Sequence, residues 1–298
     1  MYTNSANLPF RKILSIDFEY CGADGEVPKI VCMVIQDLRS GVVSRYWRDD
    51  LGKMNTPPFE TGEDVAIVSY FAPAEVQSMV ALSWTINVSV IDLFAEFRCQ
   101  TNGDPNVGRK SLVSALQFYG LKQFVPEEKD SMRDLILSGG PLSETQRSAI
   151  LDYCQQDVIA LGPLLDAMLR HAPWSELKFN QAILRGRYMK AVGAMQHRGI
   201  PIDLDMFDKL NANWEDIKLN LIENVDAQYG VYVDGRFKEA LFQSYLARGM
   251  IPWPRLDSGR LALDRNTFSN MSKRYPIVQP LHELRKTLGE FKLNNLAV

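Results

Sequence analysis

Two short groups of residues carry side chains whose types and spacing suit metal-assisted hydrolysis. In the first, Asp17 and Glu19 flank Phe18 directly after the apolar run 13–16. Alternate residues of a strand point to the same face, so the two carboxylates are expected to lie side by side. They would repel each other unless a cation lay between them. This group alone fits both a metal site and a pair of solvated acids on an edge strand.

The second group is Tyr153-Cys154-Gln155-Gln156-Asp157, inside a stretch with helical periodicity. Side chains four residues apart lie one above the other on a helix, so Tyr153 and Asp157 converge. Leu151, Val158 and Leu161 indicate that this helix packs on a sheet. An acid near a packed face needs a partner. A metal ion would serve, and so would a hydrogen bond from the tyrosine or an ordinary ion pair.

A further carboxylate is expected from one of two places. Glu75 follows an apolar run, and Pro73 suits the first turn of a helix, where an acid also stabilises the helix dipole. Asp92 ends the next apolar run, and it could instead form an ion-paired corner with Glu96 and Arg98. The residues favour Glu75 but leave both open.

The residues around these groups predict an α/β domain. Apolar, β-branched runs separated by glycine-containing turns predict strands that form an antiparallel meander, followed by strands that alternate with helices. The expected strands are 13–16, 29–38, 44–47, 65–68 and 88–93, and the expected helices are 74–82 and 110–119. Ser143 and Gln146 have the spacing of a capping box, which predicts a long helix that runs to about residue 170.

The rest of the chain is predicted to be a smaller, mostly helical region. A helix is expected over 176–196, stopped by Gly199 and Pro201, and Asp203 is expected to cap a second long helix that ends before Gly230. Shorter helices are expected near 237–247, 266–274 and 278–293. We place the domain boundary between 171 and 172, so that 1–171 and 172–298 form the two domains.

Composition narrows the function classes. No run of about 18 apolar residues exists and the first residues do not form a secretory signal, so a cytoplasmic protein is expected. Four scattered cysteines and three scattered histidines argue against a disulfide framework, a zinc knuckle and histidine-based catalysis. Residues 1–170 hold 15 basic and 22 acidic residues, whereas 171–298 hold 18 and 14. Such an acidic first half suits nucleic acid only where divalent cations neutralise part of its charge.

The strand-borne D-x-E and the later helical Y-x-x-x-D, in this order within one α/β domain, resemble the motifs of the DEDD exonuclease superfamily. This resemblance implies a ribonuclease-H-like fold and a 3′–5′ exonuclease that releases nucleoside monophosphates. By the same resemblance, Asp17, Glu19 and Asp157 would bind metal ions, and Tyr153 would orient the attacking water.

The fourth metal ligand departs from the family pattern. The family usually has an aspartate at the start of a helix, where this chain offers Glu75, with Asp92 as its competitor. Oxygen ligands without a neighbouring histidine or cysteine select Mg²⁺ or Mn²⁺. Two such ions about 4 Å apart stabilise the attacking and leaving oxygens of a phosphodiester displacement.

Five residues are predicted to bind the nucleic acid. Arg109, Lys110 and Lys129 are expected to contact phosphates. Phe18 and Tyr20 are expected to stack on terminal bases, although a core position also suits Phe18.

The second half contains four segments whose order looks like the link between the proofreading domain and the thumb of bacterial and phage family A DNA polymerases. They are 198–203, 251–254, 257–260 and 282–285, with 263–264 and 274–276 between the last two. The resemblance implies the front part of a longer polymerase or a free-standing relative, with a DNA 3′ end as partner and a role in proofreading during replication. Polymerisation by this chain alone is not expected. An RNA-trimming, ribonuclease D-like enzyme and a catalytically silent nucleic-acid-binding or scaffolding domain are the alternatives.

Overall fold

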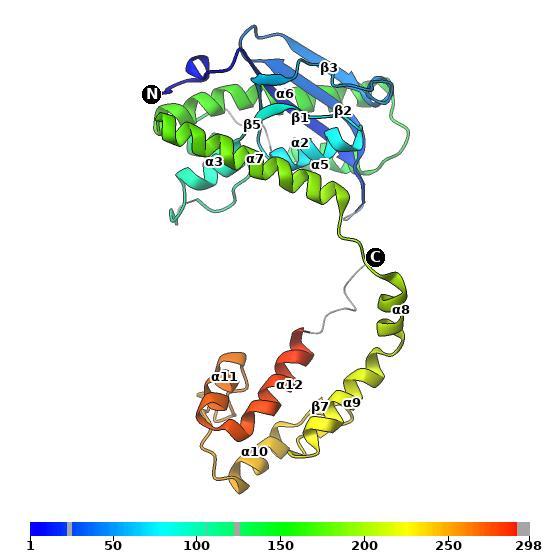
Figure 1. Ribbon diagram of the computed structural model, residues 1–298, viewed down its shortest axis with the longest axis vertical. Coiled ribbons are helices and arrows are strands. Elements are labelled where there is room, and N and C mark those ends of the chain that lie inside the picture. The colour runs from blue at the N-terminus through cyan, green and yellow to red at the C-terminus, as the bar shows by residue number, and fades with distance from the viewer. Residues whose placement is uncertain (23–25, 106, 122–125, 291–298) are drawn as a thin grey trace. The chain divides into compact units, whose positions relative to one another are not determined.

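A five-stranded mixed sheet lies at the centre of the first unit of the chain, Met1–Ile200 (Figure 1). The computed structural model describes residues 1–22, 26–105, 107–121 and 126–290, and the side chains of 126–130 lie outside this description. The strands follow the order β3-β2-β1-β4-β5. They are β1 Lys12–Cys21, β2 Lys29–Asp37, β3 Val43–Trp47, β4 Gly62–Ser69 and β5 Val88–Asp92.

The strand directions bring distant parts of the sequence to one edge of the sheet. β1, β2 and β3 form the antiparallel meander that the sequence predicts, whereas β1, β4 and β5 run parallel. The C-terminal ends of three strands therefore meet at the same edge, where ligand sites of such sheets commonly form. The predicted α/β fold class is confirmed.

Alternation along β1 separates the cores on the two faces of the sheet. Leu14, Ile16 and Phe18 join a core that includes residues of helix α2, Ala72–Ala81. Ile13 joins the core formed with helix α6, Glu144–His171. Asp17 and Glu19 are in phase with Ile13, so both carboxylates lie on the face that α6 covers.

Helix α6 begins where the sequence predicts. The Ser143 hydroxyl accepts a hydrogen bond from the backbone N–H of Gln146 at 3.3 Å, and the Gln146 side chain accepts one from the backbone N–H of Ser143 at 2.8 Å. This reciprocal capping box satisfies two backbone donors at the start of the helix. The other helices between the start of the chain and α6 are η1 Ser5–Asn7, α1 Arg48–Leu51, α3 Leu93–Gln100, α4 Leu112–Phe118 and α5 Pro126–Leu137. The sequence patterns predicted neither α3 nor α5.

Helix α7, Glu176–Arg198, packs on β5 and α2 through two glycines. A Cβ at Gly186 would overlap the carbonyl oxygen of Val90, and one at Gly193 would lie 2.7 Å from the carbonyl oxygen of Pro73. The helix thus belongs to the unit Met1–Ile200. The boundary predicted after residue 171 does not coincide with this limit. The contacts that join α7 to the sheet are made by glycines, which leave no trace in a sequence pattern of apolar residues. How far the functional domain extends stays a prediction.

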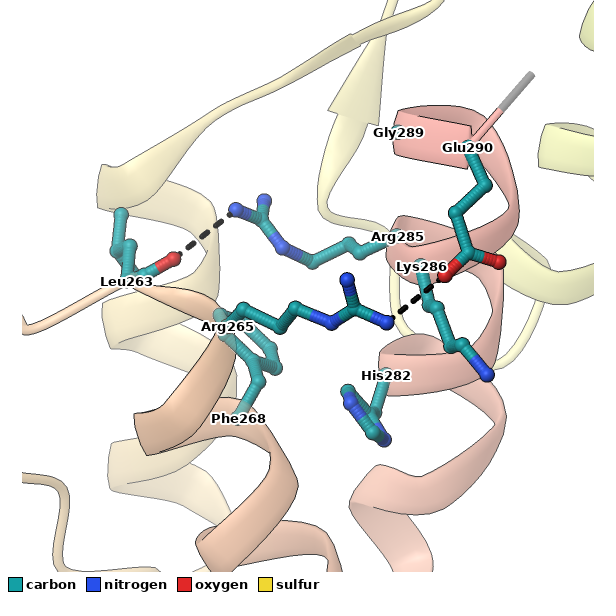
Figure 2. Close-up of a pocket in the computed structure, with 8 residues that line it drawn as sticks. All are labelled: Leu263, Arg265, Phe268, His282, Arg285, Lys286, Gly289 and Glu290. Atoms are coloured by element: carbon teal, nitrogen blue, oxygen red, sulfur yellow. Dashed lines mark hydrogen bonds and ion pairs between the residues drawn. The ribbon is translucent and has the colours of Figure 1, made fainter. Parts of the chain in front are cut away.

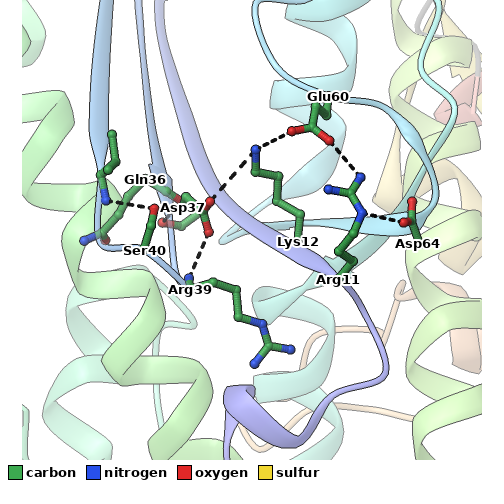
Figure 3. A network of polar contacts seen from close by, with 10 residues as sticks. Arg11, Lys12, Gln36, Asp37, Arg39, Ser40, Glu60 and Asp64 are labelled. Atoms are coloured by element: carbon green, nitrogen blue, oxygen red, sulfur yellow. Dashed lines mark hydrogen bonds and ion pairs between the residues drawn. The ribbon is translucent and has the colours of Figure 1, made fainter.

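Ion pairs connect the start of β1 with the segment before β4 (Figure 3). Arg11 donates to Glu60 and to Asp64, each at 2.7 Å, and Lys12 donates to Glu60 at 2.8 Å. Most of these side chains are half exposed, so solvent screens the pairs and each contributes little to stability. They lie at the opposite end of β1 from Asp17 and Glu19.

The second unit, Pro201–Val298, is mostly helical and has a core of its own. Phe242, Phe268 and Leu281 are fully buried at its centre. Its elements are α8 Leu204–Ala212, α9 Trp214–Asp226, the hairpin β6 Tyr232–Val233 and β7 Arg236–Phe237, α10 Glu239–Arg248, α11 Arg265–Arg274, η2 Pro276–Val278 and α12 Gln279–Glu290. None of the helices that the structure describes in either unit combines the length and the hydropathy that a membrane crossing requires.

One predicted helix of this unit is wrong in its extent. The sequence predicts a single helix from Asp203 to just before Gly230, whereas the structure has α8 and α9 with Asn213 between them. The backbone N–H and the side-chain amide of Asn213 both donate to the carbonyl oxygen of Lys209, at 3.2 and 2.8 Å. A side chain that competes for helical carbonyls in this way ends α8.

The glycine contact of α7 generates a stability prediction. We expect Gly186→Ala to lower the free energy of unfolding of the first unit by about 3 kcal/mol or more, because backbone atoms of β5 cannot move aside for a methyl group. Gly140→Ala is the control, since a Cβ there meets nothing within 4 Å, and it should change stability by less than about 1 kcal/mol. Urea unfolding of both variants measures the difference. Equal stability of the two would contradict the described packing.

Candidate active site

Asp17 and Glu19 extend from β1 toward α6 at the edge where β1, β4 and β5 end. The thiol of Cys154 on α6 donates to the carbonyl oxygen and to Oδ2 of Asp17, each at 3.4 Å. Asp17, Glu19 and Cys154 place potential ligand atoms within 4.8 Å of one another. The carboxylates of the first motif and Cys154 of the second motif are thus brought together.

Cys154 is the member of this group that the sequence analysis missed. It precedes Asp157 by three residues, so helical spacing alone places it on the same face as Asp157. The thiol is fully buried, and its pKa is raised by burial first, and then by a hydrogen bond with Cys32 and by the nearby carboxylates. Cys154 therefore acts as a neutral hydrogen-bond donor to Asp17.

Glu75 approaches the same place from the first turn of α2. Its side chain is 5% exposed, the backbone N–H of Phe18 donates to it, and its Oε2 is buried without a hydrogen-bond partner among the described residues. Burial raises its pKa well above the usual value, and the charges of Asp17 and Glu19 raise it further. A buried carboxylate oxygen without a partner is costly, and a cation would remove that cost.

Asp92, the competitor of Glu75, uses its side chain to hold two helices. Its Oδ1 accepts from the backbone N–H of Ala95 at 2.7 Å and caps α3, and its Oδ2 accepts from the backbone N–H of Ala72 at 2.8 Å. Burial raises its pKa to about 6, against the opposing effect of these N–H groups. Asp92 thus positions the start of α2, whereas Glu75 faces the carboxylates of β1.

The ion pairs considered between Asp92, Glu96 and Arg98 are replaced by other contacts of the two later residues. Glu96 is buried and makes two charge-assisted bonds to Arg185 of α7, at 2.6 and 2.8 Å. Arg98 lies over the ring of Phe94, 5.6 Å from its centroid.

Tyr153 is close enough to the carboxylates of β1 and to Asp157 for their charges to act on its hydroxyl. Burial raises the pKa of its hydroxyl, and the charges of Asp157, Glu19 and Asp17 raise it further, in that order. The hydroxyl therefore stays protonated at neutral pH and is available as a hydrogen-bond donor. Asp157 lies one helical turn further along α6 than Tyr153 and outside the group of ligand atoms within 4.8 Å.

The two aromatic residues predicted to stack on bases differ in position. Phe18 is 4% exposed, and its ring packs against Trp84 with centroids 6.4 Å apart. Stacking by Phe18 is therefore corrected to a core role, the alternative that the sequence also allowed. Tyr20 is 37% exposed, and burial of its remainder together with the charges of Glu75, Asp17 and Glu19 raises its pKa. It stays a candidate for contact with a base.

The three predicted phosphate contacts also differ. The side chain of Lys110 points into the protein. Its Nζ donates to the Thr101 hydroxyl at 3.0 Å and to the carbonyl oxygen of Val107 at 3.3 Å. These bonds correct its predicted phosphate contact, because its ammonium group is already held. Arg109 is exposed and stays a prediction. The side chain of Lys129 lies outside the described residues.

Comparison with known proteins bears on the fold. No family model and no curated protein matches the sequence. Over 97% of its length the chain is similar to the POL domain of Pol1 from M. smegmatis, solved in complex with DNA primer-template and dNTP, with 14% identity and a TM-score of 0.57. The chain spans 48% of that structure. At this identity the likeness shows a shared fold.

Two further solved structures align with the chain less closely. Brucella melitensis NrnC aligns with 66% of this chain and 89% of its own length, at 16% identity and a TM-score of 0.44. The catalytic core of RRP6 from Trypanosoma brucei aligns with 94% of this chain and 74% of its own length, at 10% identity and a TM-score of 0.43.

The different environments of Glu75 and Asp92 predict that their substitutions change the free energy of unfolding in opposite directions. We expect Glu75→Gln to raise the free energy of unfolding in EDTA by roughly 1 kcal/mol, because it removes a buried acid that faces two like charges. Asp92→Asn should lower it by about 1–3 kcal/mol, because one of two backbone N–H groups loses its acceptor. Urea unfolding in EDTA measures both, and a loss in both variants would place Glu75 in a structural role.

Proposed function

We propose that the first unit is a divalent-metal-dependent 3′–5′ exonuclease that acts on DNA ends. The observation that carries the proposal is the convergence of acidic side chains from two separate elements on a tyrosine of a third. Asp17 and Glu19 come from β1 and Glu75 from α2, and the charges of Asp17, Glu19 and Asp157 all act on Tyr153 of α6. A fold that brings like charges together at this cost provides a place for cations.

The donor set suits Mg²⁺ or Mn²⁺. Carboxylate oxygens are the ligands that these ions prefer. The Oε2 of Glu75 has no hydrogen-bond partner among the described residues and is available to bind such an ion. The sequence prediction of a site without a neighbouring cysteine is corrected by Cys154, but its thiol is neutral and donates a hydrogen bond to Asp17, so it is not counted among the ligands. Asp17, Glu19, Glu75 and Asp157 would hold the ions. Two bound ions would supply positive charge to the attacking and leaving oxygens of an in-line displacement.

The protein's own groups then have separate tasks. Tyr153, kept protonated by its surroundings, donates a hydrogen bond that orients a water molecule toward the terminal phosphorus. The water oxygen forms a new bond to phosphorus as the bond to the 3′ oxygen of the preceding nucleotide breaks. One water proton passes to solvent, the departing 3′ oxygen gains a proton, and a nucleoside 5′-monophosphate is released. Tyr20, beside the carboxylates and partly exposed, is placed to contact the terminal base.

DNA is the proposed substrate, and proofreading the proposed role. The resemblance of the ordered motifs, together with the fold shared with the Pol1 structure, supports DNA over RNA. A longer chain with a polymerase domain would be the partner in that role. Rates on DNA and RNA strands of the same sequence separate proofreading from ribonuclease D-like trimming.

The first functional prediction concerns the carboxylates. With Mn²⁺ or Mg²⁺, the wild-type protein should release mononucleotides from the 3′ end of a single strand, and Asp17→Asn should lower the rate by at least about 10³-fold. Asp152→Asn is the matched control, because Asp152 is exposed on the same helix as Tyr153 and pairs with Arg45. It should keep the wild-type rate. Strand binding without cleavage by the wild-type protein in either metal would instead identify a silent binding domain.

The second functional prediction concerns Tyr153. Tyr153→Phe removes only the hydroxyl, so we expect metal binding to persist while kcat falls about 10- to 1,000-fold. Mn²⁺ affinity by calorimetry and single-turnover cleavage measure the two effects. A loss of metal affinity equal to that of Asp17→Asn would mean that Tyr153 maintains the site's structure instead of orienting water.

A further inference from the structure

The second unit contains a cavity of about 260 Å³ between α11 and α12 (Figure 2). Three of the eight residues that line it are permanent cations. The lining comprises Leu263, Arg265, Phe268, His282, Arg285, Lys286, Gly289 and Glu290. The cavity is smaller than the roughly 300–1,000 Å³ of pockets that hold whole drug-sized ligands. Its size suits one small charged group.

Arg285 is the fixed cation of this cavity. Its guanidinium carbon lies 4.3 Å from the ring centroid of Phe237 and 4.5 Å from that of Phe268, so two aromatic rings hold the group. One N–H donates to the carbonyl oxygen of Leu263 at 3.3 Å, and Tyr232 contributes a further hydrogen bond. Burial lowers its pKa, and in the part of the chain that the structure describes no carboxylate pairs with it.

The charges around Arg285 do not balance. Arg265 is paired with Glu290 at 2.8 Å, and both side chains are more than half exposed. Lys286 is exposed and has no ion pair among the described residues. Three permanent cations therefore face one carboxylate, an excess of two positive charges that a phosphate group would neutralise.

We propose that this cavity binds a phosphate group, supplied by a nucleic-acid strand or by a free nucleotide. The planar guanidinium of Arg285, held by its rings, presents N–H groups in a fork that matches phosphate oxygens. Arg265 and Lys286 line the same cavity from α11 and α12 and add positive charge, and the side chain of Lys286 extends away from the guanidinium of Arg285 (Figure 2). Glu290 opposes an anion and holds Arg265 in its absence. The site belongs to the second unit and does not depend on the exonuclease proposal.

Binding in EDTA tests the site without cleavage. The full chain is titrated into a labelled single-stranded DNA and followed by fluorescence anisotropy at several salt concentrations. We expect Lys286→Gln to weaken binding about three- to tenfold and to lower the salt slope by about 0.7. Glu290→Gln should strengthen binding about threefold, because it removes the opposing charge. Inorganic phosphate at constant ionic strength should compete with the strand for the wild-type protein.

Two controls carry the same charge changes outside the cavity. Lys273→Gln on α11 and Glu283→Gln on α12 are both exposed and do not line it, so both should bind within about twofold of wild type. Equal effects of Lys286→Gln and Lys273→Gln, or no competition by phosphate, would overturn the proposal. A nucleoside monophosphate that binds as tightly as the strand would identify a free nucleotide as the source, and weaker binding would identify the strand. Either result, with the expected response to Lys286→Gln, supports the phosphate site.

Discussion

Carboxylates of like charge repel one another, and the first unit gathers several of them where β1 ends. Asp17 and Glu19 are neighbours on one face of the strand, and both act on the buried Glu75. Leaving an acid in that environment opposes folding, so the rest of the unit must supply the free energy that keeps the three together. The sheet does this with hydrophobic cores on both of its faces, in which β1 is buried along most of its length.

Each acid is held by an element whose position has an identifiable cause. The parallel pairing of β1, β4 and β5 sets the edge at which the acids meet, and the side chain of Asp92 attaches the start of α2 to the end of β5. The capping box of α6 sets where that helix begins, and Cys154 connects it to Asp17. Burial and backbone capping, more than the exposed ion pairs of Arg11 and Lys12, therefore decide the geometry of the site.

The sequence predicts the elements and the acids better than it predicts their supports. Two signals are local and can be recognised without knowledge of tertiary contacts. They are the alternation at Asp17 and Glu19 and the helical spacing of Tyr153 and Asp157. The bond by which Asp92 positions α2 is different, because it depends on the backbone N–H of Ala72, twenty residues earlier. Cys154 gains its role only when α6 lies against β1. The break of the long helix at Asn213 depends on one side chain that competes with the backbone, and such a competition has no periodic signature.

The glycine contact of α7 has a consequence for the divergence of related chains. Gly186 and Gly193 are required by the approach of one backbone to another, whereas Leu184, Tyr188 and Met195 on the same helix are exposed. Selection for folding therefore acts on the two glycines whether or not the acids are used, and leaves the exposed positions open to drift. A lineage that lost its carboxylates and its chemistry would keep these glycines. In an alignment of relatives, they would trace the inheritance of the architecture, and the acids would trace the inheritance of the activity.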